Sequence, residues 1–389
     1  MSERLRRQFG AVALLAASAL VGSCGAERPS DRDTPATLWF SVQDSGRTRS
    51  ITVANALCER CIEVERLVLL GDTTGDGFLE MTTAATRDSL GRYWLGQRGQ
   101  IKVYNPSGKF VAAVGRPGQG PMEFHLPTPT FTDSAGLVHV FDRGNSRESV
   151  INSKFALHSD RRIPASDVFS VAPNVGAGTY VMNMWIATEA QAGYNLHVVR
   201  GDSILKSFGE PDESGTMNVF TSQRLLATDG DGRVLSAKRF DLDVVAWSPE
   251  GRRIAGFRGS PLNASPVKWA AFNRTDNPLP SEVVAIRIED GRYLWLVTKR
   301  PRDGWRSLVT DKLYPNGMVG MAPKPGVAID SMFVSRIEVV DLSSATILAR
   351  RETSEKFIGF IGSGLLLENA TDAEGHPRAA VWRLRLRLP

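Results

Sequence analysis

Two stretches of this sequence repeat one pattern: Val68-Leu-Leu-Gly-Asp-Thr-Thr-Gly-Asp-Gly-Phe-Leu-Glu80 and Ala112-Ala-Val-Gly-Arg-Pro-Gly-Gln-Gly-Pro-Met-Glu-Phe124. Each is a short apolar strand, followed by a glycine-rich turn and by an acidic residue beside a hydrophobic one. About twenty residues after the opening glycine of each stretch, a second glycine turn leads into another apolar strand, within Arg87–Leu95 and Thr132–Val140. This spacing indicates a repeated β unit.

The signal of a glycine turn followed by a buried strand recurs four more times. It is found at Gly176–Met182, Asp229–Ser236, Glu289–Trp295 and Gly362–Glu368. A meander of about four strands cannot bury both of its faces alone, so neighbouring units must stack around a common axis. Six units across residues 62–389 average about 55 residues, a length that propeller blades with insertions allow. The sequence therefore predicts an all-β fold, a six-bladed β-propeller of four-stranded antiparallel blades.

The two ends of the repeat region complement each other. The last unit ends with the strand Ala379–Leu386 and has no return strand, whereas the first unit begins with an unpaired strand, Val64–Leu70. We expect the N-terminal strand to complete the last blade, because this arrangement removes a free sheet edge and ties the ends of the domain together.

The composition fits one large domain of this kind. The chain has 389 residues, of which 42% are hydrophobic and 23% charged, with 36 Gly and 21 Pro. This glycine and proline content is far below that of low-complexity chains. The 47 basic residues only slightly exceed the 42 acidic ones, and no long basic block follows the N-terminus. We therefore expect no nucleic-acid partner.

Residues 1–23 have the organisation of an export signal. Three arginines precede an uncharged stretch, Phe9–Ser23, which is too short for a membrane-spanning helix of about 20 residues. Removing the signal takes away these three arginines and one glutamate, and lowers the formal net charge from +5 to +3. Much of the basic excess therefore belongs to targeting.

The end of this signal, Val21-Gly22-Ser23-Cys24, resembles the lipobox of bacterial lipoproteins. The resemblance implies that Cys24 is acylated, becomes the N-terminus of the mature chain and anchors it in a membrane. By the same resemblance, Gly25 in place of an aspartate implies the outer membrane, at its periplasmic face or at the cell surface. A plain secretory signal with an incidental cysteine is the alternative.

The mature chain is expected to begin with a tether and to continue as one domain. Residues 24–36 are polar and contain proline, which is typical of a flexible segment. The propeller is expected over residues 37–389, with a strand extension over 37–61 and the blades over about 62–389. We expect this domain to be a monomer.

With Cys24 acylated, two cysteines remain, Cys58 and Cys61, in the sequence Cys-Glu-Arg-Cys. An exported compartment is oxidising, so a local disulfide is expected. A thioredoxin-like redox site would need a βαβ context, a c-type haem a histidine after the second cysteine, and a zinc site two more ligands nearby. None of these features is seen in the sequence. A structural disulfide or an unreactive thiol pair is therefore favoured over redox or metal chemistry.

A second resemblance is carried by Val138-His-Val-Phe-Asp142-Arg-Gly-Asn145-Ser-Arg147 and by Gly115–Phe124. These stretches are similar to the blade signature and the glycine-rich strand connection of NHL-type propellers, especially those of bacterial six-bladed lipoproteins. The resemblance is sharp over about residues 110–150. It implies a structural role for Asp142 and Arg147, as a carboxylate and guanidinium pair that fixes a turn.

Motifs for chemistry are scarce. The sequence contains no nucleophile elbow, no phosphate-binding loop and no zinc-protease motif. Asp72 and Asp76, like Asp229 and Asp231, have calcium-like spacing for two ligands but lack the third ligand and the terminal glutamate, so we expect surface turns and no metal site. Six-bladed lactonases and arylesterases arrange Glu, Asn and Asp around an axial calcium; Glu123, Asn145 and Asn195 offer such side chains here, although no spacing requires it.

Two insertions indicate where a ligand binds. The first, residues 259–281, is rich in proline; the second, residues 300–335, separates two strands of the fifth unit and is much longer than a hairpin turn. The connection between the second and third strands of a blade lies at the channel end where propeller ligands usually bind. The candidate binding residues at this channel mouth are Arg300, Arg302, Trp305, Arg306 and Tyr314.

These side chains suit an acidic or sugar ligand, through ion pairs and stacking, while a decoration that covers the channel is the alternative. Two function classes follow. The first is a membrane-tethered, non-catalytic propeller that binds a protein, peptide or glycan without a cofactor. The second is a calcium-dependent hydrolase or lyase acting on a lactone, ester or polysaccharide. The fold does not decide between them, and the missing catalytic constellation favours the first.

Overall fold

The computed structural model describes residues 47–388, except for 81, 83, 165–166, 174–177, 187–192, 210–221, 230–231, 260–278, 280, 315–316, 318 and 363. The chain divides into two units, 1–37 and 38–389, and the described residues all belong to the second. The expected signal, Cys24 and tether lie outside the described residues, as do Gly176, Asp231 and most of the insertion 259–281. In the described part of the chain, no helix has the length and hydropathy needed to cross a membrane.

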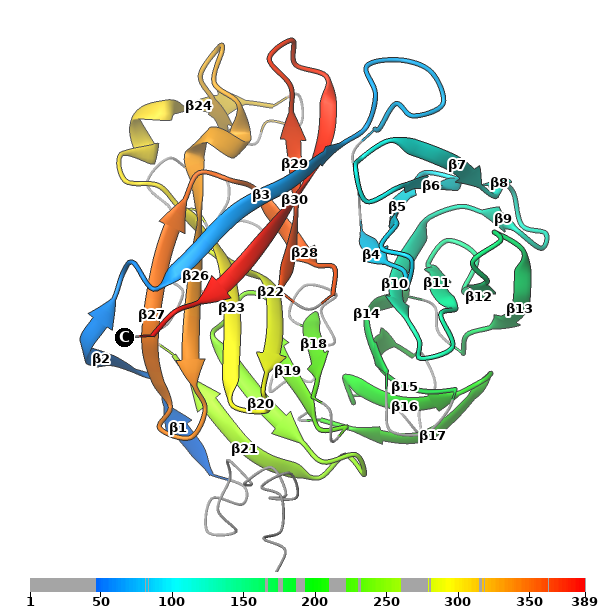
Figure 1. Cartoon of the computed structure of the whole chain (residues 1–389). Coiled ribbons are helices and arrows are strands. Elements are labelled where there is room, and N and C mark those ends of the chain that lie inside the picture. Colours follow the sequence, from blue (N-terminus) through cyan, green and yellow to red (C-terminus); the bar gives the residue numbers. More distant parts are fainter. Residues whose placement is uncertain are drawn as a thin grey trace, which may run out of the picture. The chain divides into compact units, whose positions relative to one another are not determined.

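Six four-stranded antiparallel sheets form the blades of a propeller, as predicted (Figure 1). Blades 1 to 3 consist, from the first strand to the last, of β4 (Ala85–Arg87), β5 (Tyr93–Gln97), β6 (Gln100–Tyr104) and β7 (Phe110–Val114); β10 (Pro127–Thr132), β11 (Val138–Asp142), β12 (Arg147–Ile151) and β13 (Leu157–Arg162); and β14 (Asp167–Pro173), β15 (Thr179–Trp185), β16 (Leu196–Arg200) and β17 (Ser203–Phe208).

Blades 4 to 6 continue this order around the ring. They consist of β18 (Arg224–Thr228), β19 (Val234–Lys238), β20 (Asp243–Trp247) and β21 (Arg253–Arg258); β22 (Glu282–Glu289), β23 (Tyr293–Pro301), β26 (Phe333–Asp341) and β27 (Thr346–Thr353); and β28 (Phe357–Phe360), β29 (Leu365–Thr371), β30 (Pro377–Leu386) and β3 (Ile62–Leu70). The first strands of several neighbouring blades, such as β14 and β18 or β18 and β22, contact each other around the central channel.

One hydrophobic cluster fills each of the six interfaces between neighbouring blades. Because both faces of a blade are covered, its second and third strands are almost continuously buried, as in Tyr93–Gln97. Trp94 and Trp295 are the largest fully buried side chains, in the interfaces of blades 1 and 2 and of blades 5 and 6. Each fully buried large side chain stabilises the fold by about 1.5–3 kcal/mol.

The N-terminal strand completes the last blade, which confirms the predicted closure. Strand β3 pairs antiparallel with β30, from Ile62 opposite Leu386 to Leu70 opposite Ala379. Ile62 and Leu70 are fully buried, the first in the interface with blade 5 and the second in the interface with blade 1.

The residues before β3 run along the outer edges of two more blades. Strand β1 (Thr48–Ser50) pairs parallel with β21, and β2 (Thr52–Cys58) pairs parallel with β27, so that blades 4 and 5 have five strands. A disulfide joins Cys58 to Cys61 between β2 and β3, and Cys61 packs in the core of blades 5 and 6. This segment covers two sheet edges that would otherwise be open to solvent.

The two repeated stretches occupy equivalent positions, each leading from the last strand of one blade to the first strand of the next. The opening glycines Gly71 and Gly115 have φ angles of 102° and 79°. A Cβ at these positions would lie 2.9 Å from Leu79 and 2.3 Å from Phe124, the buried hydrophobic residues that end the two patterns. The short strands β8 (Arg116–Pro117) and β9 (Glu123–Phe124) pair within the second stretch. The glycines are therefore required by backbone conformation and by close packing.

The blade-signature residues fix this connection, although not as a mutual pair. Asp142 is fully buried and accepts hydrogen bonds from the backbone N–H groups of His125 and Leu126, each 2.8 Å long. The amide of Asn145 donates to the same carboxylate, at 2.8 Å. Arg147 instead donates to the carbonyl oxygens of residues 119 and 120, at 2.7 and 2.8 Å, and forms an ion pair with Asp160. The carboxylate of Asp142 thus binds backbone N–H groups, and the guanidinium of Arg147 binds backbone carbonyl groups. The two side chains therefore fix different sides of the turn.

A charged network is buried between blades 2 and 3. Nδ1 of His139 lies 2.7 Å from Oε1 of Glu148, whose other oxygen accepts a hydrogen bond from Arg161. Arg161 also donates to the hydroxyl of Tyr180, at 2.7 Å. Burial raises the pKa of Glu148, but the hydrogen bonds from His139 and Arg161 outweigh burial and hold this pKa below its ordinary value.

We expect Gly115→Ala to lower the free energy of unfolding by about 2–4 kcal/mol, because it combines a strained φ with a clash against Phe124. Gly75→Ala is the matched control, since Gly75 has a φ of 77° but no atom within 4 Å of a Cβ; its loss should be about 1 kcal/mol. Urea unfolding measures both variants. Equal losses would show that the contact with Phe124 does not constrain the turn.

We expect Glu148→Gln to lower the free energy of unfolding at neutral pH by about 1.5–3 kcal/mol, because it removes the charge of the buried carboxylate to which Arg161 donates. The folded pKa of Glu148 is depressed, so its contribution is present above the unfolded pKa and is lost as the pH falls through the folded value. The variant should therefore show a shallower loss of stability below about pH 4.5 than the parent chain. Glu374→Gln, at an exposed position, should change neither quantity.

Candidate functional site

The insertion of blade 5, residues 302–332 between β23 and β26, is a small structure of its own. It contains the 3-10 helices η4 (Trp305–Leu308) and η5 (Ile329–Met332) and the hairpin of β24 (Val309–Leu313) and β25 (Val319–Pro323). A small core of Leu279, Val309 and Met332 holds it together. Because strands alternate in direction, this insertion lies at the same end of the blades as the connections from one blade to the next; we call this the upper end.

A cavity of about 980 Å³ lies between this insertion and the upper end of blade 5. Its described lining includes five cationic side chains and two carboxylates. The cations are Arg300, Arg302, Arg306, Arg336 and Lys356, and the carboxylates are Asp303 and Glu352. The structure thus brings together four of the five residues predicted to bind a ligand, and adds two cations.

Arg300 is the most deeply placed of these cations. Its Nε donates to Thr298 Oγ1 at 3.0 Å, and its guanidinium lies 3.9 Å from Oε2 of Glu338. Glu338 binds Arg350 more closely, at 2.7 Å. Burial lowers the pKa of Arg300, and the positive charges of Arg336 and Arg350 add to this effect. The guanidinium of Arg300 thus lies among positive charges that its carboxylate partner, Glu338, only partly neutralises.

Strand register explains this concentration of charge. In the pairing of β23 with β26, Thr298 lies opposite Arg336 and Leu296 opposite Glu338. In the pairing of β26 with β27, Glu352 lies opposite Arg336 and Arg350 opposite Glu338. Because alternate residues of a strand share a face, Arg300, Arg336, Glu338, Arg350 and Glu352 lie on one face of blade 5. Arg336 forms its closest ion pair with Glu352, at 2.5 Å.

Trp305 supports the cavity wall. It packs against the small core of the insertion, and the guanidinium of Arg306 lies 4.8 Å from the centre of its ring. This is a cation–π contact within the protein. The ring therefore positions Arg306 beside the part of the cavity wall that Trp305 forms.

Tyr314 is not part of the cavity lining, which corrects the prediction that grouped it with the four other residues. It follows β24 at the far end of the hairpin, where its ring lies over Gly320. Nζ of Lys312 lies 5.5 Å from the centre of the ring. Sequence proximity suggested a shared site, but the five residues of extended β24 carry Tyr314 away from η4.

The central channel forms a second cavity, of about 770 Å³, lined by the first strands of the blades. Lys356 lines both cavities, so they meet at this residue. Its Nζ donates to the carbonyl oxygen of Phe333 at 2.7 Å, and burial lowers its pKa. Two further cations of the channel are paired, Arg239 with Glu282 at 2.9 Å and Lys299 with Asp330 at 3.4 Å.

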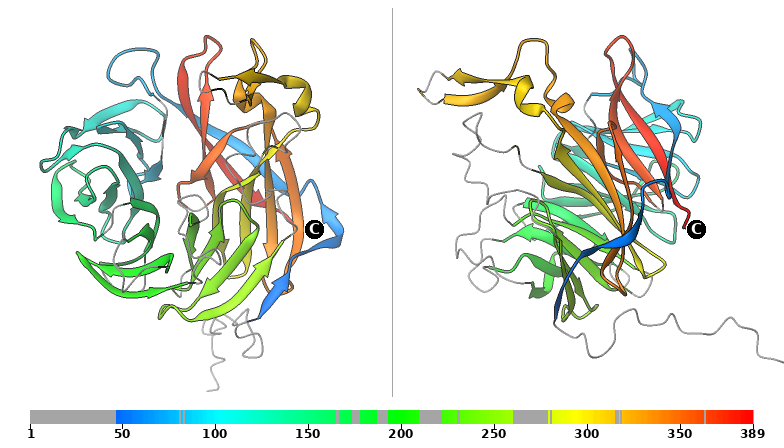
Figure 2. Two further views of the ribbon diagram at one scale, coloured as in Figure 1. Left: turned by 180° about the vertical axis from the view of Figure 1, so that it is seen from behind. Right: turned by 90° about the vertical axis from the view of Figure 1, so that its left-hand side faces the viewer.

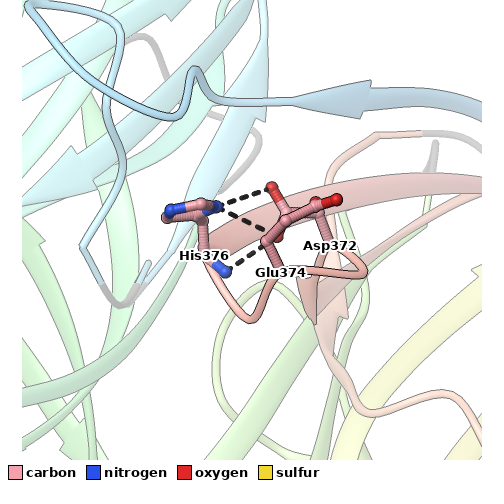
Figure 3. A group of neighbouring side chains, drawn as sticks. All are labelled: Asp372, Glu374 and His376. Atoms are coloured by element: carbon pink, nitrogen blue, oxygen red, sulfur yellow. Dashed lines mark hydrogen bonds and ion pairs between the residues drawn. The ribbon is translucent and has the colours of Figure 1, made fainter.

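Among the described residues, one group of three possible metal-ligating side chains was found: Asp372, Glu374 and His376, in the turn between β29 and β30 (Figure 3). Asp372 already accepts a hydrogen bond from the backbone N–H of His376 at 2.8 Å and forms an ion pair with Arg378 at 2.9 Å. A guanidinium this close opposes a cation at the same carboxylate. The arrangement is that of a side chain that stabilises its own turn.

None of the three residues considered for an axial calcium is among the described lining residues of the central channel. Glu123 accepts hydrogen bonds from the backbone N–H groups of residues 119 and 120 and forms an ion pair with Arg116. Asn145 donates to Asp142 in the same connection, whereas Asn195 precedes β16 in blade 3. Asp229, from the second calcium-like turn, forms an ion pair with Arg233 at 2.5 Å.

Sequence reasoning missed Arg336 and Lys356 as cavity residues. Arg336 and Glu338 alternate on β26 with apolar residues, so a charged face of blade 5 was detectable. Lys356 lies in the connection from β27 to β28, where no pattern distinguishes it from other surface lysines. Its position becomes evident only when the ring brings this connection beside the insertion.

Neither a scan of protein-family models nor a search of curated protein sequences finds a match to this chain. Solved structures do match. The "Putative exported protein" from Bacteroides fragilis is 13% identical, covers 88% of this chain and 99% of its own, and has a TM-score of 0.56. A member of the DUF4221 family from Bacteroides vulgatus is 10% identical, covers 85% of this chain and 100% of its own, and has a TM-score of 0.54. At these identities the similarity concerns the fold.

Proposed function

We propose that this chain is an exported, lipid-anchored propeller lipoprotein of the NHL-like kind that binds an anionic ligand in the cavity of blade 5. The ligand is an acidic group carried by a protein, a peptide or a glycan, and the anchor is the acylated Cys24 in the outer membrane. The name of the Bacteroides fragilis protein, which describes it as exported, is in keeping with export. The lipobox-like Val21–Cys24 supports the anchor.

The observation that carries the binding proposal is the excess of positive charge in the cavity. Among the described residues, five cationic side chains and two carboxylates line it, and Glu352 is already bound to Arg336. Burial lowers the pKa of Arg300 most, and the repulsion from Arg336 and Arg350 lowers it further; an anion bound beside Arg300 would offset this repulsion. Guanidinium groups bind carboxylates and phosphates with two parallel hydrogen bonds, which gives both affinity and orientation.

The cavity is large enough for a ligand of several functional groups. Its 980 Å³ lie at the upper limit of small-molecule sites, and its junction with the channel at Lys356 leaves room for an extended chain. Among its described lining residues there is no histidine or cysteine. The side chains therefore support recognition more directly than acid–base chemistry.

We expect Arg300→Gln and Arg306→Gln each to weaken binding of an anionic probe about tenfold, which corresponds to about 1.4 kcal/mol. Citrate, glucuronate and inorganic phosphate serve as probes in calorimetric titrations, and added salt should weaken binding because the attraction is electrostatic. Arg252→Ala is the control, since this side chain is 80% exposed and lies between β20 and β21, at the opposite end of the blades. The proposal would be contradicted if all variants bound the probes as strongly as the parent chain does. It would also be contradicted if the parent chain bound none of the three anions.

We expect Cys24→Ala to abolish membrane anchoring through lipid. Metabolic labelling with palmitate should mark the parent chain and not the variant, and the parent chain should be recovered with the outer-membrane fraction. Labelled parent chain in the inner-membrane fraction would refute the sorting inferred from Gly25, and unlabelled parent chain would refute the lipobox assignment.

A further inference from the structure

The hairpin of β24 and β25 projects from the upper end of blade 5, beyond the strands of the propeller (right view of Figure 2). Its two strands pair only with each other, from Val309 opposite Pro323 to Leu313 opposite Val319. An isolated two-stranded hairpin is marginally stable in water. This one is fixed at its base, where Val309 and Met321 belong to the small core of the insertion.

The far half of the hairpin exposes apolar side chains. Leu313 is 70% exposed and Val319, its cross-strand partner, is 46% exposed. Tyr314, at 38%, lies on the opposite face beside Lys312. Alternation along the strands puts Val309, Leu313 and Val319 on one face, together with Asp311 and Met321. This face is therefore apolar at its buried base and at its exposed end, with one carboxylate between them.

We propose that the far half of this hairpin, through its described residues Lys312, Leu313, Tyr314 and Val319, docks on the phospholipid bilayer to which the chain is tethered. The side chains of Leu313 and Val319 enter the boundary between headgroups and acyl chains, and Tyr314 and Lys312 lie at headgroup level. This inference rests on the proposed function, because the acyl group of Cys24 brings the bilayer within reach.

The length of the tether supports this occupant. Twenty-two residues, 25–46, separate Cys24 from Arg47, the first described residue. Fully extended at about 3.3–3.6 Å per residue, they span about 75 Å. A tethered surface is present at a high effective concentration, so that even a weak second contact becomes occupied. Combining an acyl chain with a second, weaker signal is a general way of holding a protein at a membrane.

The chemistry of the tip also suits a membrane surface. Tyrosine is enriched where one end of a ring is apolar and the other is hydrated, and lysine is attracted to anionic headgroups. Asp311 lies on the apolar face below Leu313, opposite Met321. Burying this carboxylate in acyl chains would be unfavourable, so we expect insertion to stop at the tip.

The test uses a fluorescent label in the mature, acylated protein. Leu313→Cys introduces the only free thiol once Cys24 is acylated and Cys58 is joined to Cys61. An environment-sensitive nitrobenzoxadiazole label is attached there, and the protein is reconstituted into vesicles of phosphatidylethanolamine and phosphatidylglycerol. Leu90→Cys is the control, because Leu90 is 61% exposed in the turn between β4 and β5, at the opposite end of the blades.

We expect the label at 313 to emit at shorter wavelength and to be quenched several-fold less by iodide than the label at 90. Vesicle flotation separates this result from the anchoring proposal. If the protein floats but both labels are quenched equally, anchoring holds and the hairpin inference is overturned. If the protein does not float, the anchoring proposal fails, and the labels are then measured with vesicles added in excess. Protection of the label at 313 supports the hairpin inference, and lack of protection overturns it. Protection at 313 without vesicles would show contact with protein and would also overturn it.

Discussion

The pairing of β3 with β30 is the constraint on which the rest of this structure depends. Every blade contributes both of its faces to hydrophobic clusters, and a closed ring of six clusters requires all six blades to be complete. Strand β3 supplies Ile62 to one cluster and Leu70 to the next. Without β3, two interfaces lose buried side chains and blade 6 presents an open edge. Since β3 and β30 are more than 300 residues apart in sequence, this closure requires most of the chain.

The closed ring also fixes the positions of the side chains that line the cavity of blade 5. The core of the insertion has few fully buried residues, too few to hold a fixed geometry alone. It is held at both ends by the long strands β23 and β26, which are paired along nine residues. That register sets Arg300 beside Arg336 and Glu338. Rigid strands thus place cationic groups that a flexible loop would allow to separate.

Much of the fold could be predicted from the sequence, because its strongest requirements are local. Glycine is needed where φ is positive and a Cβ would clash, so Gly71 and Gly115 recur with their hydrophobic partners. Counting the strands of the last unit showed that one was missing, and the unpaired N-terminal strand could therefore be assigned to it. The site was predicted less well, because contacts between distant segments decide it: Lys356 comes from another connection, and Tyr314 is carried outward by strand geometry. Likewise, Arg147 and Asp142 are neighbours in register but bind opposite sides of one turn.

The repeated glycines and apolar strands of this sequence follow from how a propeller is built. The geometry of the blades requires these residues, and it leaves function to side chains in the connections at the upper ends of the blades. Here a single insertion supplies both a cationic rim, through Arg302 and Arg306, and an exposed apolar tip, through Leu313. Charge and apolar surface recognise different partners. One connection, fixed by three buried residues and two paired strands, thereby gives a uniform scaffold two chemically distinct surfaces.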